Sequence, residues 1–273
     1  MFEMVGDLSS FIFLGIACFV ASFVDAIAGG GGLISVPAFL ASGLPAHVAL
    51  GVNKFSCCSG TVASSIRFAR SGKVNWDLVK RLAPFSFLGA ILGVRTVVLI
   101  DSKYLYPLVI ALLIILLIYT LCNKKMGEKN EFLGFDGKSI KKGMCMAVAL
   151  GFYDGFFGPG TGSLLIFGLI KIFKFDFTNA SGNTKILNLS SNLSSVMTFI
   201  FLGKVNYLYG IIMAVIMVIG ATLGAKTAVT RGTKFIKPFF LVMTTIVLVK
   251  MIAESIFGIN VGLLLKNIMS IFI

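Results

Sequence analysis

Charged residues are scarce in this sequence. Only 13% of its 273 residues are Asp, Glu, Lys or Arg, whereas 57% are hydrophobic and the mean hydropathy is +0.98. A soluble domain carries about 25% charged residues and uses them to cover its surface. The composition therefore excludes an ordinary soluble protein. We expect an all-α integral membrane protein whose surrounding solvent is largely lipid.

Histidine and cysteine are also rare, with one histidine and five cysteines in the chain. Cys57 and Cys58 are adjacent, and the other cysteines lack the spacing of a metal site. The sequence offers no histidine-based metal site and no pair of nucleophile and base, so we expect no metal, no cofactor and no enzyme. A membrane enzyme acting on a sulfur compound through Cys57 and Cys58 stays open as an alternative.

Acidic residues number only 11, against 24 Lys and Arg, which gives a net charge of +13. Most of the basic residues fall in expected loops. Lys and Arg collect in the cytoplasmic loops of membrane proteins, which explains the charge better than a nucleic-acid partner does. We therefore expect the lipid bilayer as a partner and no nucleic acid, and the sequence leaves a homo-oligomer open.

The chain contains an internal repeat. A shift of 131 residues aligns GKVNW (72–76) with GKVNY (203–207), and the same shift aligns GAILGVRTVV (89–98) with GATLGAKTAV (220–229). Upstream, a shift of 129 residues aligns Asp25 with Asp154. Self-similarity at a fixed distance indicates two structurally equivalent halves.

We divide the chain accordingly into four segments. They are a first membrane repeat (1–122), a cytoplasmic linker (123–142), a second membrane repeat (143–257) and a C-terminal hydrophobic segment (258–273). Each repeat is expected to hold a short helical hairpin with a glycine-rich tip, followed by three transmembrane helices. In the first repeat the hairpin arms are predicted at 11–24 and 33–44, and the transmembrane helices at 48–68, 78–100 and 104–122.

Basic residues of equivalent loops lie in opposite places in the two halves. The loop after the first transmembrane helix is strongly basic in the first half, whereas its counterpart holds only Lys204. The next loop is mixed in charge in the first half and basic in the second. The positive-inside rule then predicts two inverted-topology repeats, with the N-terminus outside and the linker inside, a plan that is common in secondary transporters. Hairpin arms of about 18–21 Å are shorter than the ~30 Å membrane core, so each hairpin is expected to enter and leave on the same side.

The glycine-rich tips are GGGG (29–32) and GPGTG (158–162), which follow Asp25 and Asp154. Non-helical backbone at membrane depth must line protein or water, so the tips predict an internal polar cavity. Helices that resume after the tips present free amides and the positive end of a dipole, which suit an anion. Close packing needs only one small face, so it explains consecutive glycines poorly. We expect it instead for the helix glycines with four-residue spacing, Gly89, Gly93, Gly220 and Gly224.

A polar stripe follows each tip on the next helix. Its members are spaced by 3, 4 and 3 residues and share one helical face; they are Lys54, Cys57, Thr61 and Ser64 in the first half and Lys185, Asn188, Asn192 and Ser195 in the second. A polar stripe turned toward lipid is costly, so it is predicted to face the cavity. Lys54 and Lys185 would then supply positive charge to an anion, with snorkelling to the interface as the alternative.

The candidate substrate site combines both tips and both stripes. Its predicted residues are Gly29, Gly30, Gly31, Gly32, Ser35, Asn53, Lys54, Gly158, Gly160, Thr161, Gly162, Ser163, Thr184, Lys185, Asn188 and Asn192. Two interpretations of Asp25 and Asp154 are open. Each pairs with a lysine or holds its tip by accepting backbone hydrogens, or one or both take up a proton and couple transport to the proton gradient.

Both half-motifs resemble those of a known family. Residues 25–56, DAIAGGGGLISVPAFLASGLPAHVALGVNKFS, resemble the first half-motif of the TauE/SafE (sulfite exporter, DUF81) family of membrane permeases. Residues 151–170, GFYDGFFGPGTGSLLIFGLI, and 179–192, NASGNTKILNLSSN, resemble the second. The resemblance spans nearly the whole chain. It implies a multi-pass protein of a bacterial or archaeal inner (cytoplasmic) membrane that moves a small anion, such as sulfite, thiosulfate or an organosulfonate.

We therefore expect a secondary transporter, or permease, that moves such an anion by alternating access. The alternatives are an anion channel, a transporter of a non-sulfur organic anion, and the membrane enzyme of sulfur metabolism.

Overall fold

The computed structural model describes residues 8–101, 104, 130–132 and 134–231, and within these ranges all regular structure is helical. The helices are α1 (Leu8–Ala28), α2 (Gly32–Ala41), α3 (Ala46–Arg70), α4 (Trp76–Leu99), α6 (Gly137–Phe156), α7 (Thr161–Phe173), α8 (Phe177–Phe201) and α9 (Tyr207–Arg231). The predicted helix at 104–122 lies outside the described residues except for Tyr104, and the C-terminal segment 258–273 lies wholly outside them.

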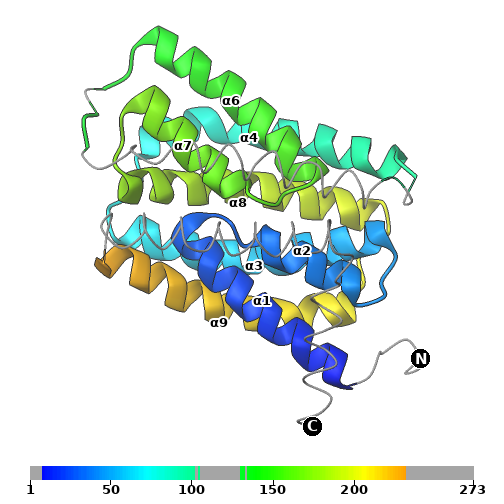
Figure 1. Ribbon diagram of the computed structural model, residues 1–273. Coiled ribbons are helices and arrows are strands. Elements are labelled where there is room, and N and C mark those ends of the chain that lie inside the picture. Colours follow the sequence, from blue (N-terminus) through cyan, green and yellow to red (C-terminus); the bar gives the residue numbers. More distant parts are fainter. Residues whose placement is uncertain (1–7, 102–103, 105–129, 133, 232–273) are drawn as a thin grey trace, which may run out of the picture.

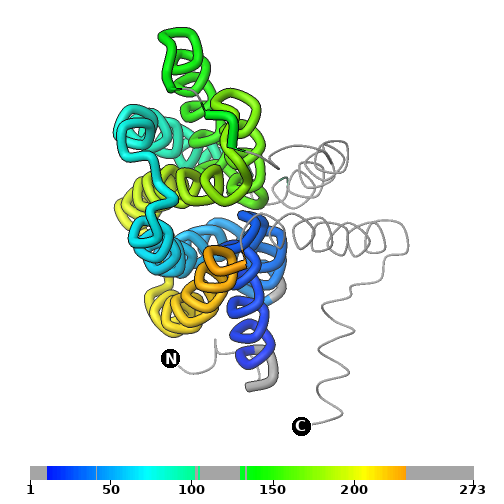
Figure 2. Tube along the Cα trace, turned by 90° about the vertical axis from the view of Figure 1, so that its left-hand side faces the viewer, coloured from blue at the N-terminus to red at the C-terminus, as the bar shows by residue number. Residues whose placement is uncertain are grey.

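The helices form two bundles stacked on one another (Figure 1, Figure 2). One bundle contains α1, α2, α3 and α9, and the other contains α4, α6, α7 and α8. Each bundle thus holds three helices from one half of the chain and one from the other, because α4 packs against α6 and α8 while α9 packs against α1 and α3. The helices α3 and α8 contact each other at the seam between the bundles.

Glycines allow the two exchanged helices to approach their partners closely. A Cβ atom at Gly93 of α4 would collide with the Phe152 carbonyl oxygen of α6, and one at Gly220 of α9 would lie 2.5 Å from the Phe19 carbonyl oxygen of α1. Small residues at such positions let helix backbones come into contact. The packing role expected for four glycines is therefore confirmed: Gly89, Gly93, Gly220 and Gly224.

The first hairpin arm is longer than predicted. The helix α1 has 21 residues and is about 31 Å long, so the estimate of about 18–21 Å is wrong for this arm. The helix continues past Asp25 because that carboxylate is satisfied inside the protein by Lys185 and by the amide of Gly31. It ends at Ala28, directly before Gly29, whose φ is 75°. The arms after the tips are short, with 10 residues in α2 and 13 in α7.

The helix α6 begins at Gly137, inside the segment expected to be linker, six residues before the expected boundary at 143. Asp136 caps this helix: its side chain accepts a 2.9 Å hydrogen bond from the Ser139 amide, while its own amide donates to Ser139 Oγ at 3.3 Å. This reciprocal pair is a capping box. Hydrogen bonds from the Ser139 hydroxyl and amide hold the pKa of the exposed Asp136 carboxyl below its usual value.

Three described helical stretches are long and apolar enough to cross a membrane: Phe11–Ala28 in α1, Trp76–Leu99 (α4) and Tyr207–Arg231 (α9). The helices α3 and α8 are equally long, with 25 residues each, but many of their buried residues are Ser, Thr or Asn. Their position at the seam keeps these polar groups away from lipid, which explains how helices of low hydropathy fit a membrane protein.

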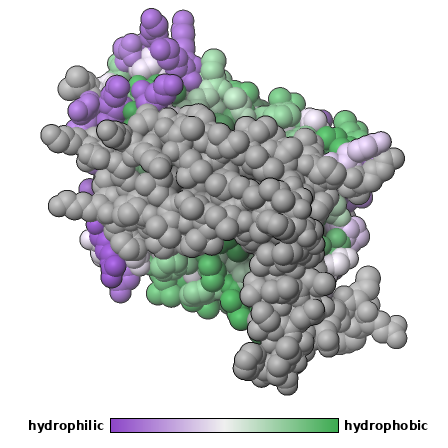
Figure 3. All heavy atoms as spheres, viewed as in Figure 1, coloured by the Kyte–Doolittle hydropathy of each residue, from purple (hydrophilic) through white to green (hydrophobic). Residues whose placement is uncertain are grey.

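Polar and apolar residues are separated on the face shown in Figure 3. Strongly polar residues gather at the left, over the beginning of α6 and along the left edge, paler polar residues lie at the right edge, and apolar residues lie between these edges where the face is not grey. In Figure 1 the same end carries the C-terminal ends of α3, α7 and α9 and the N-terminal ends of α4, α6 and α8. Exposed basic residues on these helix ends are Arg67, Arg70, Lys80, Arg81, Lys138, Lys141, Lys142, Lys171, Lys226 and Arg231.

Candidate functional site

The two glycine-rich bends meet inside the protein. The Ser163 amide donates a 3.2 Å hydrogen bond to the Gly29 carbonyl, and the Ser163 hydroxyl donates one of 3.2 Å to the Ala28 carbonyl. A Cβ atom at Gly29 would lie 2.5 Å from the carbonyl carbon of Gly162. Position 29 therefore requires glycine twice over, for its left-handed backbone and for the close contact between the two bends.

Close packing accounts for most of the four-glycine run. A Cβ atom at Gly31 would collide with the Ala21 carbonyl oxygen of α1, and one at Gly32 would lie 2.8 Å from Pro159 Cα of the other bend. Gly30 alone among the four has ordinary space, with its nearest neighbours at 3.7 Å and 3.8 Å. The expectation that packing explains consecutive glycines poorly does not hold, because the other three meet different neighbours.

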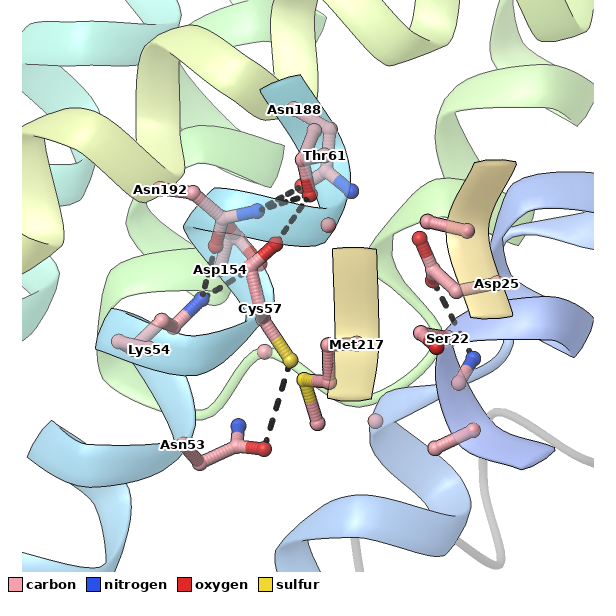
Figure 4. A pocket seen from close by; sticks show the side chains of 16 residues that line it. Ser22, Asp25, Asn53, Lys54, Cys57, Thr61, Asp154, Asn188, Asn192 and Met217 are labelled. Carbon is pink, nitrogen blue, oxygen red and sulfur yellow. Dashed lines mark hydrogen bonds and ion pairs between the residues drawn. The ribbon is translucent and has the colours of Figure 1, made fainter. Parts of the chain in front are cut away.

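A cavity lies beside the bends (Figure 4). About 40 Å³ of it is open to the centre of a water molecule, and about 10–15 Å³ of such space holds one water. The cavity therefore has room for a few waters or one small ion. Its walls come from α1, both bends, α3, the end of α6, α8 and α9, so both halves of the chain build it.

Lys54 brings a positive charge to the cavity. Its Nζ lies 2.8 Å from Asp154 Oδ1 and donates a 3.2 Å hydrogen bond to Asn192 Oδ1. The side chains of Lys54 and Asp154 are 5% and 3% exposed. Gly158 of the second bend lies against the lysine, since a Cβ atom there would come within 2.9 Å of Nζ. A buried charge needs partners of this kind, and here they join α3 of the first half to α6 and α8 of the second.

Asn192 ties the polar stripe of α8 to that of α3. Its Nδ2 donates a 3.3 Å hydrogen bond to Thr61 Oγ1 and lies 3.5 Å from Asn188 Oδ1. Beside it, Ser191 Oγ donates a 2.6 Å hydrogen bond to Asp154 Oδ2. All five residues are buried. Hydrogen bonds in a buried network reinforce one another and fix the directions of the groups in this wall.

Lys185 pairs with Asp25. Its Nζ lies 2.9 Å from Asp25 Oδ2 and also donates to the Asp25 carbonyl oxygen. Asp25 Oδ1 accepts a 3.2 Å hydrogen bond from the Gly31 amide. The Lys185 side chain is 0% exposed, whereas that of Asp25 is 26% exposed and lines the cavity. Asp25 therefore holds the end of α1 and the first bend together while part of its carboxylate stays open to the cavity.

The two ion pairs are related by the internal repeat. Lys54 is equivalent to Lys185 and Asp25 to Asp154, and each lysine pairs with the aspartate of the other half. Pairing with a lysine, which was one of the open interpretations of the aspartates, is thus present for both. The lysines differ in position, because Lys54 lines the cavity and Lys185 does not.

The structure brings part of the predicted site together in the cavity wall. The predicted residues in the wall are Asp25, Gly31, Gly32, Asn53, Lys54, Asp154, Gly158, Asn188 and Asn192. The predicted residues outside the wall are Gly29, Gly30, Ser35, Gly160, Thr161, Gly162, Ser163, Thr184 and Lys185. Several of these support the bends from behind; the Thr161 hydroxyl, for example, donates a 2.8 Å hydrogen bond to the Gly158 carbonyl. The Thr184 hydroxyl is buried and has no hydrogen-bond partner among the described residues.

Seven further residues line the cavity: Ala21, Ser22, Cys57, Gly60, Thr61, Met217 and Ala221. Cys57 and Thr61 belong to the predicted stripe, so their spacing is a sufficient signal. Ser22 lies three residues before Asp25 and therefore on the same face of α1. Met217 and Ala221 lie in the apolar helix α9, and nothing in the sequence separates them from residues that face lipid.

Comparisons with known proteins point to one family. The family model described as Sulfite exporter TauE/SafE matches residues 14–251. A Haemophilus influenzae protein called Probable membrane transporter protein is 36% identical over 239 residues, which cover 87% of this chain and 92% of that protein. Probable membrane transporter protein ORF9 of Sinorhizobium is 32% identical, with 93% and 96% covered. Probable membrane transporter protein YfcA of Escherichia coli K12 is 31% identical, with 89% and 91% covered. No solved structure matches.

Proposed function

Because the chain belongs to the sulfite exporter TauE/SafE family of membrane proteins, we propose that it is a secondary transporter for a small anion and not an enzyme. The proposed substrate class is sulfite, thiosulfate or an organosulfonate, and the proposed location is the cytoplasmic membrane. The observation that carries this proposal is the cavity beside the two glycine-rich bends, with the Lys54 ammonium in its wall.

The ends of the helices beside the cavity support an anionic substrate. The helix α2 begins at Gly32, which lines the cavity, and neither α2 nor α7 has a side-chain cap that would occupy its first amides. The positive end of the α2 dipole favours negative charge there. The expectation that the first amides are free does not hold for most of them, because those of Leu33, Ile34 and Ser163 each donate to a backbone carbonyl. In this proposal the anion lies between the start of α2, the Lys54 ammonium and the Asn53 side chain.

The arrangement of the two halves supports alternating access. The equivalent helices α3 and α8 run in opposite directions in Figure 1, and the pair α1–α9 corresponds to the pair α6–α4. Gly51 lies against the Lys204 carbonyl, just as the equivalent Gly182 lies against the Lys73 carbonyl. We take the repeats to be inverted, with the basic helix ends in the cytoplasm. Rocking of one bundle against the other then opens the cavity to each side in turn.

Uptake of labelled anions by the purified full-length protein in liposomes tests this function. The anions are sulfite, thiosulfate, methanesulfonate and, as a simple carboxylate, lactate. We expect uptake of at least one sulfur anion above that of protein-free liposomes. The double variant Lys54→Met/Asp154→Asn removes the positive charge of Lys54 together with the negative charge of Asp154, so neither charge is left unpaired in the interior. We expect it to reduce uptake by about tenfold or more, which corresponds to ~1.4 kcal/mol or more of lost interaction.

Lys80→Met is the matched control for this variant. Lys80 is an exposed basic residue on α4, away from the cavity, and its replacement is expected to leave uptake unchanged. Undiminished uptake in the double variant would remove Lys54 from the site, and no uptake of any sulfur anion by the wild-type protein would reject the function. Accumulation of the anion against its gradient would exclude a channel, since a channel only dissipates gradients.

A further inference from the structure

Among the described residues, the buried charges beside the bends balance when no substrate is present. Two lysines face two aspartates, and the closest nitrogen–oxygen distances are 2.8 Å for Lys54–Asp154 and 2.9 Å for Lys185–Asp25. An anion that enters this small cavity therefore adds an uncompensated negative charge. Such a charge is costly in the interior of a protein within a membrane. A positive charge that enters together with the anion would remove this cost.

We propose that this positive charge is a proton and that Asp25 carries it. The inference rests on the proposed function as an anion transporter and names its coupling ion. One carboxylate oxygen of Asp25 takes a proton from a hydronium ion that reaches the cavity, which forms the O–H bond of a carboxylic acid and leaves a water molecule. The acid returns the proton to water on the other side of the membrane. While Asp25 is neutral, two lysines face one aspartate, and a monovalent anion restores the balance.

Access distinguishes Asp25 from its equivalent, Asp154. The Asp25 side chain is 26% exposed and lines the cavity, whereas that of Asp154 is 3% exposed. Both oxygens of Asp154 are held by short contacts, with Lys54 at 2.8 Å and the Ser191 hydroxyl at 2.6 Å. Oδ1 of Asp25 instead accepts a longer, 3.2 Å hydrogen bond from the neutral Gly31 amide. A proton in the cavity therefore reaches Asp25 more easily than Asp154.

The groups around Asp25 are compatible with a change of its charge. From α8, Lys185 keeps a second acceptor, the Asp25 carbonyl, when the carboxylate is neutral. From α3, Lys54 and Cys57 line the same cavity, and from α6 Asp154 does so. No charged side chain of α2, α7 or α9 is among the residues that line the cavity. Lys185 therefore stays partnered in both states, and no other cavity residue has to change its charge.

The experiment uses the full-length protein in liposomes that contain a trapped pH-sensitive dye. The probes are methanesulfonate, with one negative charge, and thiosulfate, with two, because both stay ionised near neutral pH. With the outside more acidic, we expect anion uptake to acidify the lumen. Methanesulfonate should accumulate by up to about tenfold for each pH unit of gradient, the limit for one proton per anion. An imposed potassium-diffusion potential should leave methanesulfonate uptake unchanged but alter thiosulfate uptake, since thiosulfate with one proton still carries charge.

Substitutions identify the group that carries the proton. Asp25→Asn cannot accept the proton, so its accumulation ratio should fall to about one while exchange of labelled for unlabelled anion continues. Asp25→Glu keeps a carboxylate and should restore lumen acidification. Asp154→Asn is the matched control in the other half, and any uptake that it retains should still acidify the lumen.

The outcomes separate this inference from the proposed function. Anion uptake by the wild-type protein without lumen acidification overturns proton coupling and leaves the transport function standing. Lumen acidification that persists in Asp25→Asn shows that another group carries the proton. If Asp25→Asn fails to fold, the dye and potential measurements on the wild-type protein still decide whether a proton moves. No uptake of any anion by the wild-type protein rejects the function and the coupling together.

Discussion

At Gly29 the absence of a side chain decides whether the two bends can touch. In Gly29→Ala the left-handed backbone alone costs about 1–2 kcal/mol, and the new Cβ atom would lie 2.5 Å from the carbonyl carbon of Gly162. Backbone on both sides cannot move aside as a flexible side chain would. We expect a melting temperature in detergent that is lower by several degrees and a loss of anion uptake.

Gly30→Ala is the matched control for this variant. The nearest atoms to its Cβ would lie at 3.7 Å and 3.8 Å, which is ordinary contact, and Gly30 has no left-handed φ. A substitution in such a place usually changes stability by less than about 0.5 kcal/mol. If both variants melted alike, the contact between the bends would not be what requires glycine at position 29.

The same residue scale shows how far the site can be predicted from the sequence. The repeat and the 3-4-3 spacing are enough to place Lys54, Asn188 and Asn192 on faces that turn toward each other. They do not show that Lys185 is sealed behind Asp25 while the equivalent Lys54 borders the cavity. The two lysines are equivalent in the repeat, so residue spacing treats them alike. Which of them lines the cavity depends on how the two halves pack in this conformation, and spacing carries no such information.

At the scale of elements, the sequence locates the helices better than it locates their ends. The predicted helices at 48–68 and 78–100 lie within one or two residues of α3 and α4 at all four ends. The predicted first arm ended at residue 24, just before Asp25, but Lys185, 160 residues away, partners that carboxylate. A local sequence pattern cannot predict a contact between residues so far apart in the chain. The prediction therefore missed the partner that allows α1 to continue past Asp25.

A substitution in α4 can test whether its close contact with α6 stabilises the protein. A Cβ atom at Gly93 would collide with the Phe152 carbonyl oxygen and lie 2.6 Å from the Phe156 amide nitrogen. Gly93→Val should therefore push α4 away from α6 and destabilise the protein by about 1–3 kcal/mol or more. The measurement is the melting temperature in detergent. Leu92→Val, on the neighbouring residue that is 56% exposed, is the control and should change it little; equal shifts would show that the helices do not depend on this contact.

At the scale of the whole molecule, each half is completed by the other. Each bundle holds one exchanged helix, α9 or α4, packed through glycines, and each of the two ion pairs joins one bundle to the other. A half on its own would leave a lysine or an aspartate unpaired in the interior, which costs about 3–5 kcal/mol. The cavity is therefore a property of the assembled pair, and the proposed alternating access would move two halves that these ion pairs join.

Inverted repeats make a prediction that concerns the whole molecule. Ser71 in the turn between α3 and α4 and Leu202 in the turn between α8 and α9 are equivalent at the shift of 131 residues, and Leu202 is 42% exposed. If the halves are inverted, these turns lie on opposite sides of the membrane. Ser71→Cys and Leu202→Cys are introduced one at a time into a chain whose five native cysteines are replaced by serine. A thiol reagent that cannot cross membranes is then added to intact bacterial cells.

We expect the reagent to label the Leu202→Cys variant in intact cells and the Ser71→Cys variant only after the membrane is opened. The reason is that the turn after α3 lies among the basic helix ends, which the positive-inside rule places in the cytoplasm. Each variant serves as the control for the other, because both turns follow helices of 25 residues at equivalent places. Labelling of both from the outside would make the repeats parallel, and the two sides of the cavity could then no longer be opened in turn by equivalent movements of the two halves.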